Sequence, residues 1–513
     1  MDPDDLERVE ARDAQRIYAK YYRAAPLYRY DALFSHNHLN LQSLPLPPLE
    51  QTMVHYLASV EPLATADAYL EHEKDVKAFL HGEGARLQEM LASDFGSPSV
   101  AFPYSYVEKL WLDQYLELRC PTVVNVSPFY KLQDDIGPHP YDQIKRAAHF
   151  THSCLRWTRK VVAGQLDAES SPPLDMSGFY RMFSTARLPR TGCDVVKTYP
   201  GSTNVVVLSN GHAYSVEVLT PDGNIVSLES LETAFQAILT ESSGTPGPGV
   251  GAFTTADRDV WASVRLMLER NARNKACLNA IDRAILVVAL DPFPQRPRDR
   301  QVGCENLLHG NPKDRWYDKH VLVVDGAGGL GMVYDHSTTD GHHWQRMVNE
   351  TMSDMLGSRS GFSPLPALPV TSAPPAVARL SFELAGAASE ALLRAFEENA
   401  KLCEKVDLDA YIFFDFGKHE IKRWGMSPDA VVQLAMKYAY HLLLGGMPAT
   451  YETALTRRFF HGRTETIRST TRESAAWVAA MVAGEPPRRC LALLAEAVRA
   501  HGEVCARSSA GGG

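Results

Sequence analysis

The amino-acid sequence predicts an α/β or α+β fold organised in two domains. Its 513 residues exceed the ~100–200 residues of a usual single domain. Apolar residues recur with helical spacing before about residue 165, and from about residue 200 they alternate with the period of a β-strand. Five prolines between residues 364 and 375 have the composition of an interdomain linker, so we expect the domains to divide near residue 375.

Helical spacing covers several segments. Residues 4–22 carry many charges and would form a surface helix in an N-terminal extension over residues 1–40. The best-defined helix is Pro428–Leu444, because Ser427 suits its N-cap, Pro428 its first turn and Gly445-Gly446 its end. The other expected helices are Leu49–Val60, 64–93, 105–118, 141–165 and 384–402.

The predicted strands follow residue 200. Residues 205–208 and 213–218 flank Asn210-Gly211, which is a strong signal for a tight hairpin turn. Ala284–Leu290 is a continuous apolar run that suits a fully buried strand. The remaining expected strands are 320–324, 330–334 and 411–416.

The segment Gly326–Gly331 matches the pattern G-x-G-x-x-G of dinucleotide-binding proteins. That site needs a helix to begin at the glycines, so that its amides meet the pyrophosphate. Here the strand-like Met332-Val333-Tyr334 follows instead, and Asp325-Gly326 is a hairpin-turn dipeptide. We therefore expect a glycine-rich turn and no nucleotide site.

Composition and charge exclude several classes of protein. Hydrophobic residues make up 45% and charged residues 22%, as in ordinary globular proteins. The longest nearly apolar stretch, Ala475–Ala483, is about half of the ~18 residues that a membrane span needs. A net charge of −9 argues against a nucleic-acid partner. The eight cysteines form no C-x-x-C pair, which favours free thiols over a disulfide framework or a zinc site.

The two ends of the sequence carry no recognisable targeting signal. The first residues, Met-Asp-Pro-Asp-Asp-Leu-Glu, lack the basic start and apolar core of a secretory signal and are too acidic for a usual mitochondrial transit peptide. The last residues, 508–513, are not a peroxisomal Ser-Lys-Leu type ending and read as a flexible tail or a cut end. An intracellular location is expected, and a cytoplasmic one if no signal exists.

A candidate catalytic group follows the last predicted hairpin. His336, at the end of a strand, is followed four residues later by Asp340 and then by Gly341. Acyl transfer from a thioester to a hydroxyl needs a base that later protonates the leaving thiolate, and histidine suits both steps near neutral pH. Asp340 would orient the ring or form a structural salt bridge. His342 and His343 are rival bases that we expect at the surface or in packing.

Several neighbouring segments extend this pattern. Together they resemble the carnitine/choline acyltransferase family over roughly residues 44–500. The matching segments are Leu44–Thr52, Tyr56-Leu57, Pro62-Leu63, Met176-Ser177, Tyr180-Arg181, Arg187–Pro189, His309–Lys319, Asp325-Gly326, Gly331, His336, Gly417-Lys418-x-x-x-Lys422, Ser427–Ala430, Tyr451–Thr453 and Gly462–Ser469.

The resemblance implies two acyltransferase-like domains, each a mixed β-sheet packed with helices, with an active-site tunnel between them. Residues 95–375 would form the domain that carries the catalytic His336. Residues 41–94 and 376–513 would together form the second domain. The family acts without a tightly bound cofactor or metal, so coenzyme A and its acyl thioesters are expected as substrates, and the protein is expected to be a monomer.

The resemblance also assigns residue roles. His336 would be the general acid/base, with Asp340 as its paired carboxylate. Lys418 and Lys422 would hold the coenzyme A phosphates, beside a helix N-terminus that itself favours anions. Asp429 would hold the adenosine part. Tyr451 and Thr464 would donate hydrogen bonds to the carboxylate of carnitine.

The resemblance leaves alternatives open. Thr464 and Thr466 favour carnitine as the acceptor, with choline or another alcohol as the alternative. Family members continue beyond the point where this sequence stops, with an arginine for the carnitine carboxylate, a Ser-Thr-Ser element and residues that set acyl length. A non-catalytic acyl-CoA-binding protein is therefore a further alternative. By family resemblance the compartment would be mitochondrial or peroxisomal.

Overall fold

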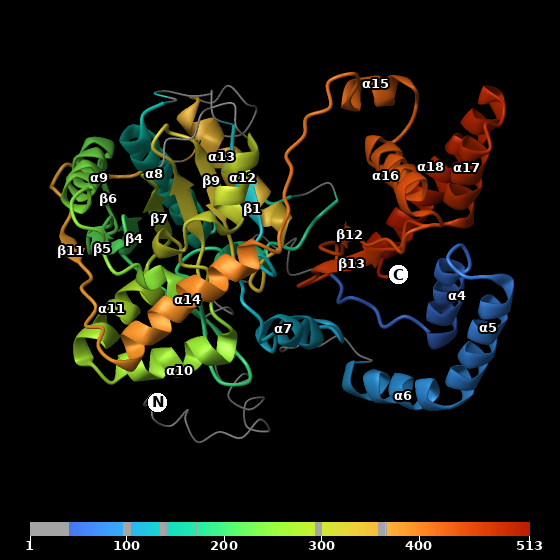
Figure 1. Cartoon of the computed structure of the whole chain (residues 1–513), viewed down its shortest axis with the longest axis horizontal. Coiled ribbons are helices and arrows are strands. Elements are labelled where there is room, and N and C mark those ends of the chain that lie inside the picture. Colours follow the sequence, from blue (N-terminus) through green and yellow to red (C-terminus); the bar gives the residue numbers. More distant parts are fainter. Residues whose placement is uncertain are drawn as a thin grey trace. The chain divides into compact units, whose positions relative to one another are not determined.

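The computed structural model describes residues 41–95, 104–133, 139, 141–169, 172–292, 300–357, 365 and 367–512. The described chain divides into two compact units. The first unit contains Trp111–Asp167 and Ser177–Tyr411, and the second contains described parts of His36–Leu110, Ala168–Met176 and Ile412–Gly513. The predicted extension over residues 1–40 lies outside the described residues. Figure 1 labels the elements of both units.

The first unit is built on a mixed sheet. Among the described residues it has seven strands in the order β1-β9-β8-β7-β4-β5-β11. The central strands β4, β7 and β8 are parallel, while the pairs on either side of them are antiparallel. This sheet with its helices confirms the predicted mixture of α and β structure. The strands are β1 (Phe129–Lys131), β4 (Asn204–Ser209), β5 (His212–Glu217), β7 (Val287–Leu290), β8 (Val321–Val324), β9 (Leu330–Val333) and β11 (Val377–Arg379).

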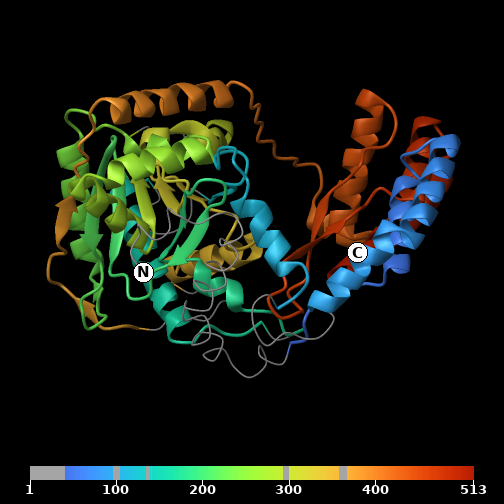
Figure 2. The ribbon, with the colours of Figure 1, turned by 90° about the horizontal axis from the view of Figure 1, so that it is seen from below.

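Helices cover both faces of this sheet. On one face, α10, α11 and α14 pack against β4, β7 and β8 in the main hydrophobic core, which includes Trp261, Leu278 and Leu392 (Figure 2). On the other face, α8 contacts β7 and β8 and packs against α9 and α13. The central strands are therefore buried on both sides, as their uniformly apolar sequences require. The helices are α8 (Gln143–Val162), α9 (Leu228–Ser242), α10 (Arg258–Glu269), α11 (Ala272–Arg283), α12 (Arg300–Glu305), α13 (Gly341–Met355) and α14 (Ala387–Cys403).

The hairpin between β4 and β5 turns at the predicted Asn-Gly pair. Asn210 has a φ of 49° and Gly211 a φ of 80°, the left-handed conformations that a type I′ turn requires. A Cβ atom on Gly211 would lie 2.7 Å from the carbonyl oxygen of Gly247. Local turn chemistry and a close backbone approach therefore both favour glycine at this position.

The glycine-rich segment after β8 is also a turn, as predicted. Asp325 Oδ1 accepts hydrogen bonds from the backbone amides of Ala327 at 2.9 Å and Gly329 at 2.8 Å. The chain then enters β9, which pairs antiparallel with β8. No helix begins at these glycines, so the amides that would hold a pyrophosphate are used inside the turn.

The second unit is mainly helical among its described residues. The helices α17 and α18 pack against each other and, with α16, enclose a small core of Leu434, Trp477, Val478 and Ala497. A two-stranded antiparallel sheet, β12 (Glu452–Leu455) with β13 (Thr464–Ile467), packs on α18. The helices are α4 (Leu49–Val60), α5 (Ala66–His81), α6 (Glu83–Phe95), α15 (Lys418–Arg423), α16 (Pro428–Leu444), α17 (Arg472–Val482) and α18 (Pro487–Ser509).

Three expectations for this unit and the segment that leads into it were wrong. Tyr411–Phe416 forms no strand, and the side chains of Tyr411 and Phe414 are 81% and 83% exposed. A strand requires a hydrogen-bonded neighbour, and no described strand pairs with this segment. The described part of the second unit therefore has an antiparallel hairpin in place of the expected mixed sheet. The predicted helix over 64–93 is also divided, into α5 and α6 on either side of Gly82.

Short elements complete the description. The hairpin of β2 (Thr185–Leu188) and β3 (Val195–Thr198) is antiparallel, whereas β6 (Ile225–Val226) and β10 (Val370–Thr371) pair in parallel. The helix α7 spans Glu108–Leu116, shorter than the expected 105–118. Single turns of 3₁₀ or π type cover Ser177–Arg181, Val250–Thr255, Asn306–Gly310 and Pro312–Asp314.

A chain of buried ion pairs joins the hairpin β2–β3 to α10 and to the segment before β8. Asp194 Oδ2 accepts hydrogen bonds from Arg187 Nε and Arg258 Nε, both at 2.7 Å. Arg258 Nη1 in turn donates to Asp318 Oδ1, and Trp261 Nε1 donates to Asp318 Oδ2, again at 2.7 Å. Each charge is shielded from water, so each depends on its partners.

Replacing Asp318 with asparagine should lower the free energy of unfolding by about 3–5 kcal/mol, because the buried guanidinium groups of Arg187 and Arg258 then share the single carboxylate of Asp194. Urea denaturation measures the effect. The matched control is Glu71→Gln, which breaks an exposed 2.7 Å pair with Lys74 and should cost less than about 1 kcal/mol. Equal effects of the two substitutions would contradict the prediction.

Candidate active site

His336 lies just beyond the end of β9, in the turn that leads to α13. Its backbone amide donates to the carbonyl of Val126 at 3.2 Å, which ties this turn to the segment before β1. The side chain is 30% exposed. The imidazole is therefore held at the edge of the sheet by regular structure on both sides and is still accessible from outside the core.

Asp340 is the N-cap residue of α13 and lies beside the histidine. Its Oδ1 is 3.7 Å from His336 Nδ1, and its side chain is only 3% exposed. This distance is longer than a hydrogen bond but suits an electrostatic interaction with a protonated ring. The sequence spacing of four residues thus brings the two predicted groups together.

Two tyrosine rings pack against the imidazole. The ring of Tyr115, near the end of α7, stacks on His336 with 5.3 Å between centroids and an angle of 27° between planes. Tyr334 contacts it from another direction, with centroids 6.1 Å apart and an angle of 52°. These contacts restrict rotation of the imidazole. The sequence offered no signal for Tyr115, because it lies far from His336 along the chain.

Arg187 contacts two groups that lie next to His336. Its Nη2 donates to the backbone carbonyl of Tyr115 at 2.6 Å, and its Nη1 lies 3.6 Å from Asp335 Oδ1. The side chain is fully buried. One guanidinium therefore fixes both the residue before His336 and the backbone of the tyrosine that stacks on it. The sequence indicated Arg187 only as part of a family segment, without a role.

The rival histidines have different surroundings. His343 is buried, and its ring packs edge-on against Phe179 at 4.6 Å between centroids. A Cβ atom on Gly178 would lie 2.5 Å from His343 Nε2, so the ring fills the space above that glycine. The expected packing role of His343 is confirmed. His342 is partly buried at the start of α13.

The second half of the predicted motif segment 309–319, together with His320 after it, is a buried support for this site. Arg315 donates to both carboxylate oxygens of Asp291, at 2.9 and 2.8 Å. Lys319 Nζ donates to the carbonyls of Thr185 at 2.8 Å and Asp282 at 2.9 Å. His320 Nδ1 accepts a 3.3 Å hydrogen bond from the amide of Asp335. The motif therefore positions the strand end that carries His336.

The predicted anion-binding residues lie in the second unit. Lys418 and Lys422 are one turn apart on α15, and both are exposed. The next helix, α16, begins as predicted, with Pro428 in its first turn and Ser427 Oγ accepting a 3.4 Å hydrogen bond from the amide of Ala430. Asp429 is exposed in the same turn. Two ammonium groups at this spacing share one helix face.

Tyr451 directly precedes β12, and Thr464 is the first residue of β13. The register pairs Leu455 with Thr464, so Tyr451 lies four positions along the chain from the residue opposite Thr464. That spacing corresponds to ~13 Å along a strand. Tyr451 is 65% exposed, while Thr464 is buried. The side chain of Tyr451 must therefore extend along the hairpin toward Thr464 if the two hydroxyl groups are to bind the same carboxylate.

The fold also assembles a group that the sequence reading did not detect. Asp429, His501 and Cys505 each place one potential ligand atom within 4.8 Å of the others. The only sequence signal is the spacing of His501 and Cys505, which are one helical turn apart. The third member comes from a different helix, so spacing within the sequence could not reveal it.

Comparison with known proteins decides the family. A family model described as choline/carnitine O-acyltransferase matches residues 44–513. The chain belongs to this family. It is similar to human mitochondrial carnitine O-palmitoyltransferase 2, at 31% identity over 92% of this chain and 77% of the relative. It is also similar to the bovine muscle isoform of carnitine O-palmitoyltransferase 1, at 32% identity over 87% of this chain and 58% of that relative.

Membership in the choline/carnitine O-acyltransferase family confirms the resemblance found in the sequence. The family match covers both compact units, including the turn of His336 and the hairpin of Tyr451 and Thr464. Among the helices of the described residues, none combines the length and apolar character needed to cross a membrane.

Burial of the Lys319 side chain leads us to predict that stability depends on pH. Burial lowers the pKa of Lys319 to about 7, whereas in the unfolded chain it is about 10.4. Between these two pKa values the unfolded chain keeps a proton on Lys319 that the folded chain has released. Raising the pH therefore favours the folded state, and the free energy of unfolding rises.

The free energy of unfolding of the wild type, relative to Lys319→Met, should therefore rise by up to about 1.4 kcal/mol per pH unit between pH 7 and 10. Denaturation at three pH values measures it. Lys74→Met, at an exposed lysine, should show no such slope. If the difference in free energy of unfolding between the wild type and Lys319→Met does not change with pH, the lowered pKa of Lys319 is contradicted.

Proposed function

We propose that this protein transfers acyl groups between coenzyme A and the hydroxyl of carnitine, with His336 as the general acid/base. The observation that carries the proposal is the accessible imidazole of His336 with the buried carboxylate of Asp340 3.7 Å away. The relatives that are named carnitine O-palmitoyltransferases support the choice of substrates.

The proposed reaction proceeds through a ternary complex without an acyl-enzyme. Neutral His336 removes the proton from the attacking hydroxyl and then protonates the departing thiolate of coenzyme A. The carboxylate of Asp340 stabilises the imidazolium that exists between the two steps. Stacking by Tyr115 keeps the ring in one orientation, so that both proton transfers use the same nitrogen.

The substrate-binding residues of the proposal lie in the second unit. Lys418 and Lys422 provide two positive charges for the phosphates of coenzyme A, next to the N-terminus of α16. Asp429 holds the adenosine part. Tyr451 and Thr464 hold the acceptor carboxylate by hydrogen bonds from their hydroxyl groups. The proposal requires that these residues and His336 act on the same bound molecules.

The finer assignments also rest on the relatives. The words palmitoyl and mitochondrial in the relatives' names lead us to propose a long acyl group and a mitochondrial location. Thr464 and Thr466 follow one another on the same face of β13, and we take them as the features that favour carnitine over choline. We propose residues 95–375 as the catalytic domain, 41–94 with 376–513 as the second domain, and a monomeric state. In the described structure β11 and α14 belong to the first compact unit, which extends to Tyr411.

Replacing His336 with alanine should lower turnover by about 10²–10⁴-fold, because the hydroxyl proton then has no acceptor. The assay measures thiol release from palmitoyl-CoA with carnitine or choline in parallel, and carnitine should be the better acceptor. His81→Ala removes an exposed histidine of α5 and should leave turnover unchanged. Unchanged turnover in His336→Ala, or acyl-CoA binding without turnover in the wild type, would contradict the proposal.

The double substitution Lys418→Ala with Lys422→Ala should raise the KM for acyl-CoA by about 10-fold or more and leave the KM for carnitine unchanged. The effect should shrink with added salt, because exposed charges are screened. Lys401→Ala, at an exposed lysine of α14, is the matched control. A rise in both KM values together would show that the two lysines do not act on coenzyme A.

A further inference from the structure

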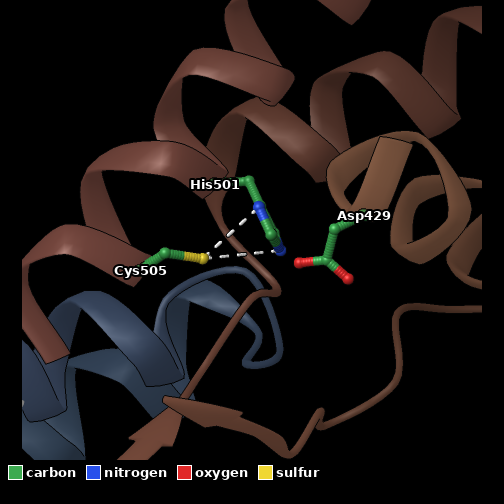
Figure 3. A group of neighbouring side chains, drawn as sticks. All are labelled: Asp429, His501 and Cys505. Carbon is green, nitrogen blue, oxygen red and sulfur yellow. Dashed lines mark hydrogen bonds between the residues drawn. The ribbon is translucent and has the colours of Figure 1, made fainter. Parts of the chain in front are cut away.

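A group of three side chains in the second unit lies apart from the histidine site. His501 and Cys505 are one turn apart on α18, and Asp429 projects toward them from the first turn of α16 (Figure 3). His501 is buried, Cys505 is half-buried and Asp429 is exposed. The three side chains thus converge from two helices, with one side of the group open to solvent.

The distances suit a tetrahedral metal ion. Cys505 Sγ lies 3.5 Å from His501 Nδ1 and 3.9 Å from Nε2. Zinc bonds of ~2.3 Å to sulfur and ~2.0 Å to nitrogen, at a tetrahedral angle, place those two ligand atoms ~3.5 Å apart. A thiol hydrogen bond to the ring could explain that distance alone, but it does not explain why a carboxylate oxygen of Asp429 also lies within 4.8 Å of the sulfur and of a ring nitrogen.

A fourth residue orients the imidazole. Glu452 Oε2 lies 2.9 Å from His501 Nε2, and both side chains are buried. The carboxylate therefore accepts the proton of Nε2 and leaves Nδ1, the nitrogen nearer the sulfur, as the basic one. Carboxylates that hold the second ring nitrogen in this way are typical of metal-binding histidines.

The charges around the group favour a cation. Two carboxylates, those of Asp429 and Glu452, lie near the ring and the thiol. Lys437, whose Nζ donates to Ser469 Oγ at 2.9 Å, is also nearby, and burial lowers its pKa. The carboxylates thus outnumber this lysine around the group. A divalent ion that binds there releases the thiol proton to water and gains a thiolate ligand.

The arrangement Cys505–His501–Glu452 also has the order of a nucleophile, a base and an orienting carboxylate. The charged side chains closest to the ring and the thiol are the carboxylates of Asp429 and Glu452. The thiol therefore lacks the electropositive surroundings that activate catalytic cysteines. This leaves metal coordination as the better explanation of the group.

We propose that Asp429, His501 and Cys505 form a Zn²⁺ site, with Glu452 as the hydrogen-bond partner of the liganding histidine. One thiolate, one imidazole and one carboxylate form a ligand set that suits Zn²⁺, whereas Mg²⁺ and Ca²⁺ prefer oxygen ligands alone. Three protein ligands leave the fourth position to water on the open side. The site goes beyond the acyl transfer proposed above, although it shares Asp429 with the proposed coenzyme A site.

The test titrates the full chain, freed of metal by a chelator, with Zn²⁺ in a calorimeter and with Co²⁺ in a spectrophotometer. The wild type should bind one Zn²⁺ at this site and show a thiolate-to-cobalt charge-transfer band with Co²⁺. Cys505→Ser and His501→Ala should abolish the band. Glu452→Gln should weaken Zn²⁺ binding by about 10–100-fold. Cys490→Ser is the matched control on the same helix and should behave as the wild type.

The absence of a charge-transfer band in the wild type would overturn the proposal, and this result does not depend on whether any variant folds. A band that persists in Cys505→Ser would also overturn it, because another thiol would then be the ligand. Neither readout uses coenzyme A or measures acyl transfer. Failure of the zinc site is therefore distinguishable from failure of the proposed function.

Discussion

The candidate active site depends on the buried guanidinium of Arg187. This group pairs with Asp194, approaches Asp335 next to the histidine, and holds the backbone of the tyrosine that stacks on the ring. A buried charge that loses its partners is strongly destabilising, so the strand end, the hairpin β2–β3 and α7 must form together. The position of His336 is thereby fixed by interactions that the imidazole itself does not make.

The two groups of functional residues differ in burial for a physical reason. Proton transfer needs an imidazole held within a fraction of an ångström, and the rings of Tyr115 and Tyr334 pack against His336. Phosphate groups are attracted by charge over longer distances, and Lys418 and Lys422 are exposed on a short helix. The exposed lysines and the histidine packed between aromatic rings therefore fit the different tasks that we propose for them.

Elements defined by local chemistry were predicted well. The turn at Asn210-Gly211 and the start of α16 at Ser427 and Pro428 both followed from preferences of a few adjacent residues. Tyr411–Phe416 has the composition of a strand but forms none, because strand formation depends on a pairing partner elsewhere in the chain. Composition alone could not supply that information.

The sequence by itself determined the family, the alternation of helices and strands, and the pairing of His336 with Asp340, since four residues in a tight turn keep two side chains close. Only the tertiary structure decided that Tyr115 and Arg187 surround this histidine, and that Asp429 meets His501 and Cys505. The reason is that contacts between distant segments follow from how helices and strands pack. Neither periodicity nor motif spacing encodes that packing.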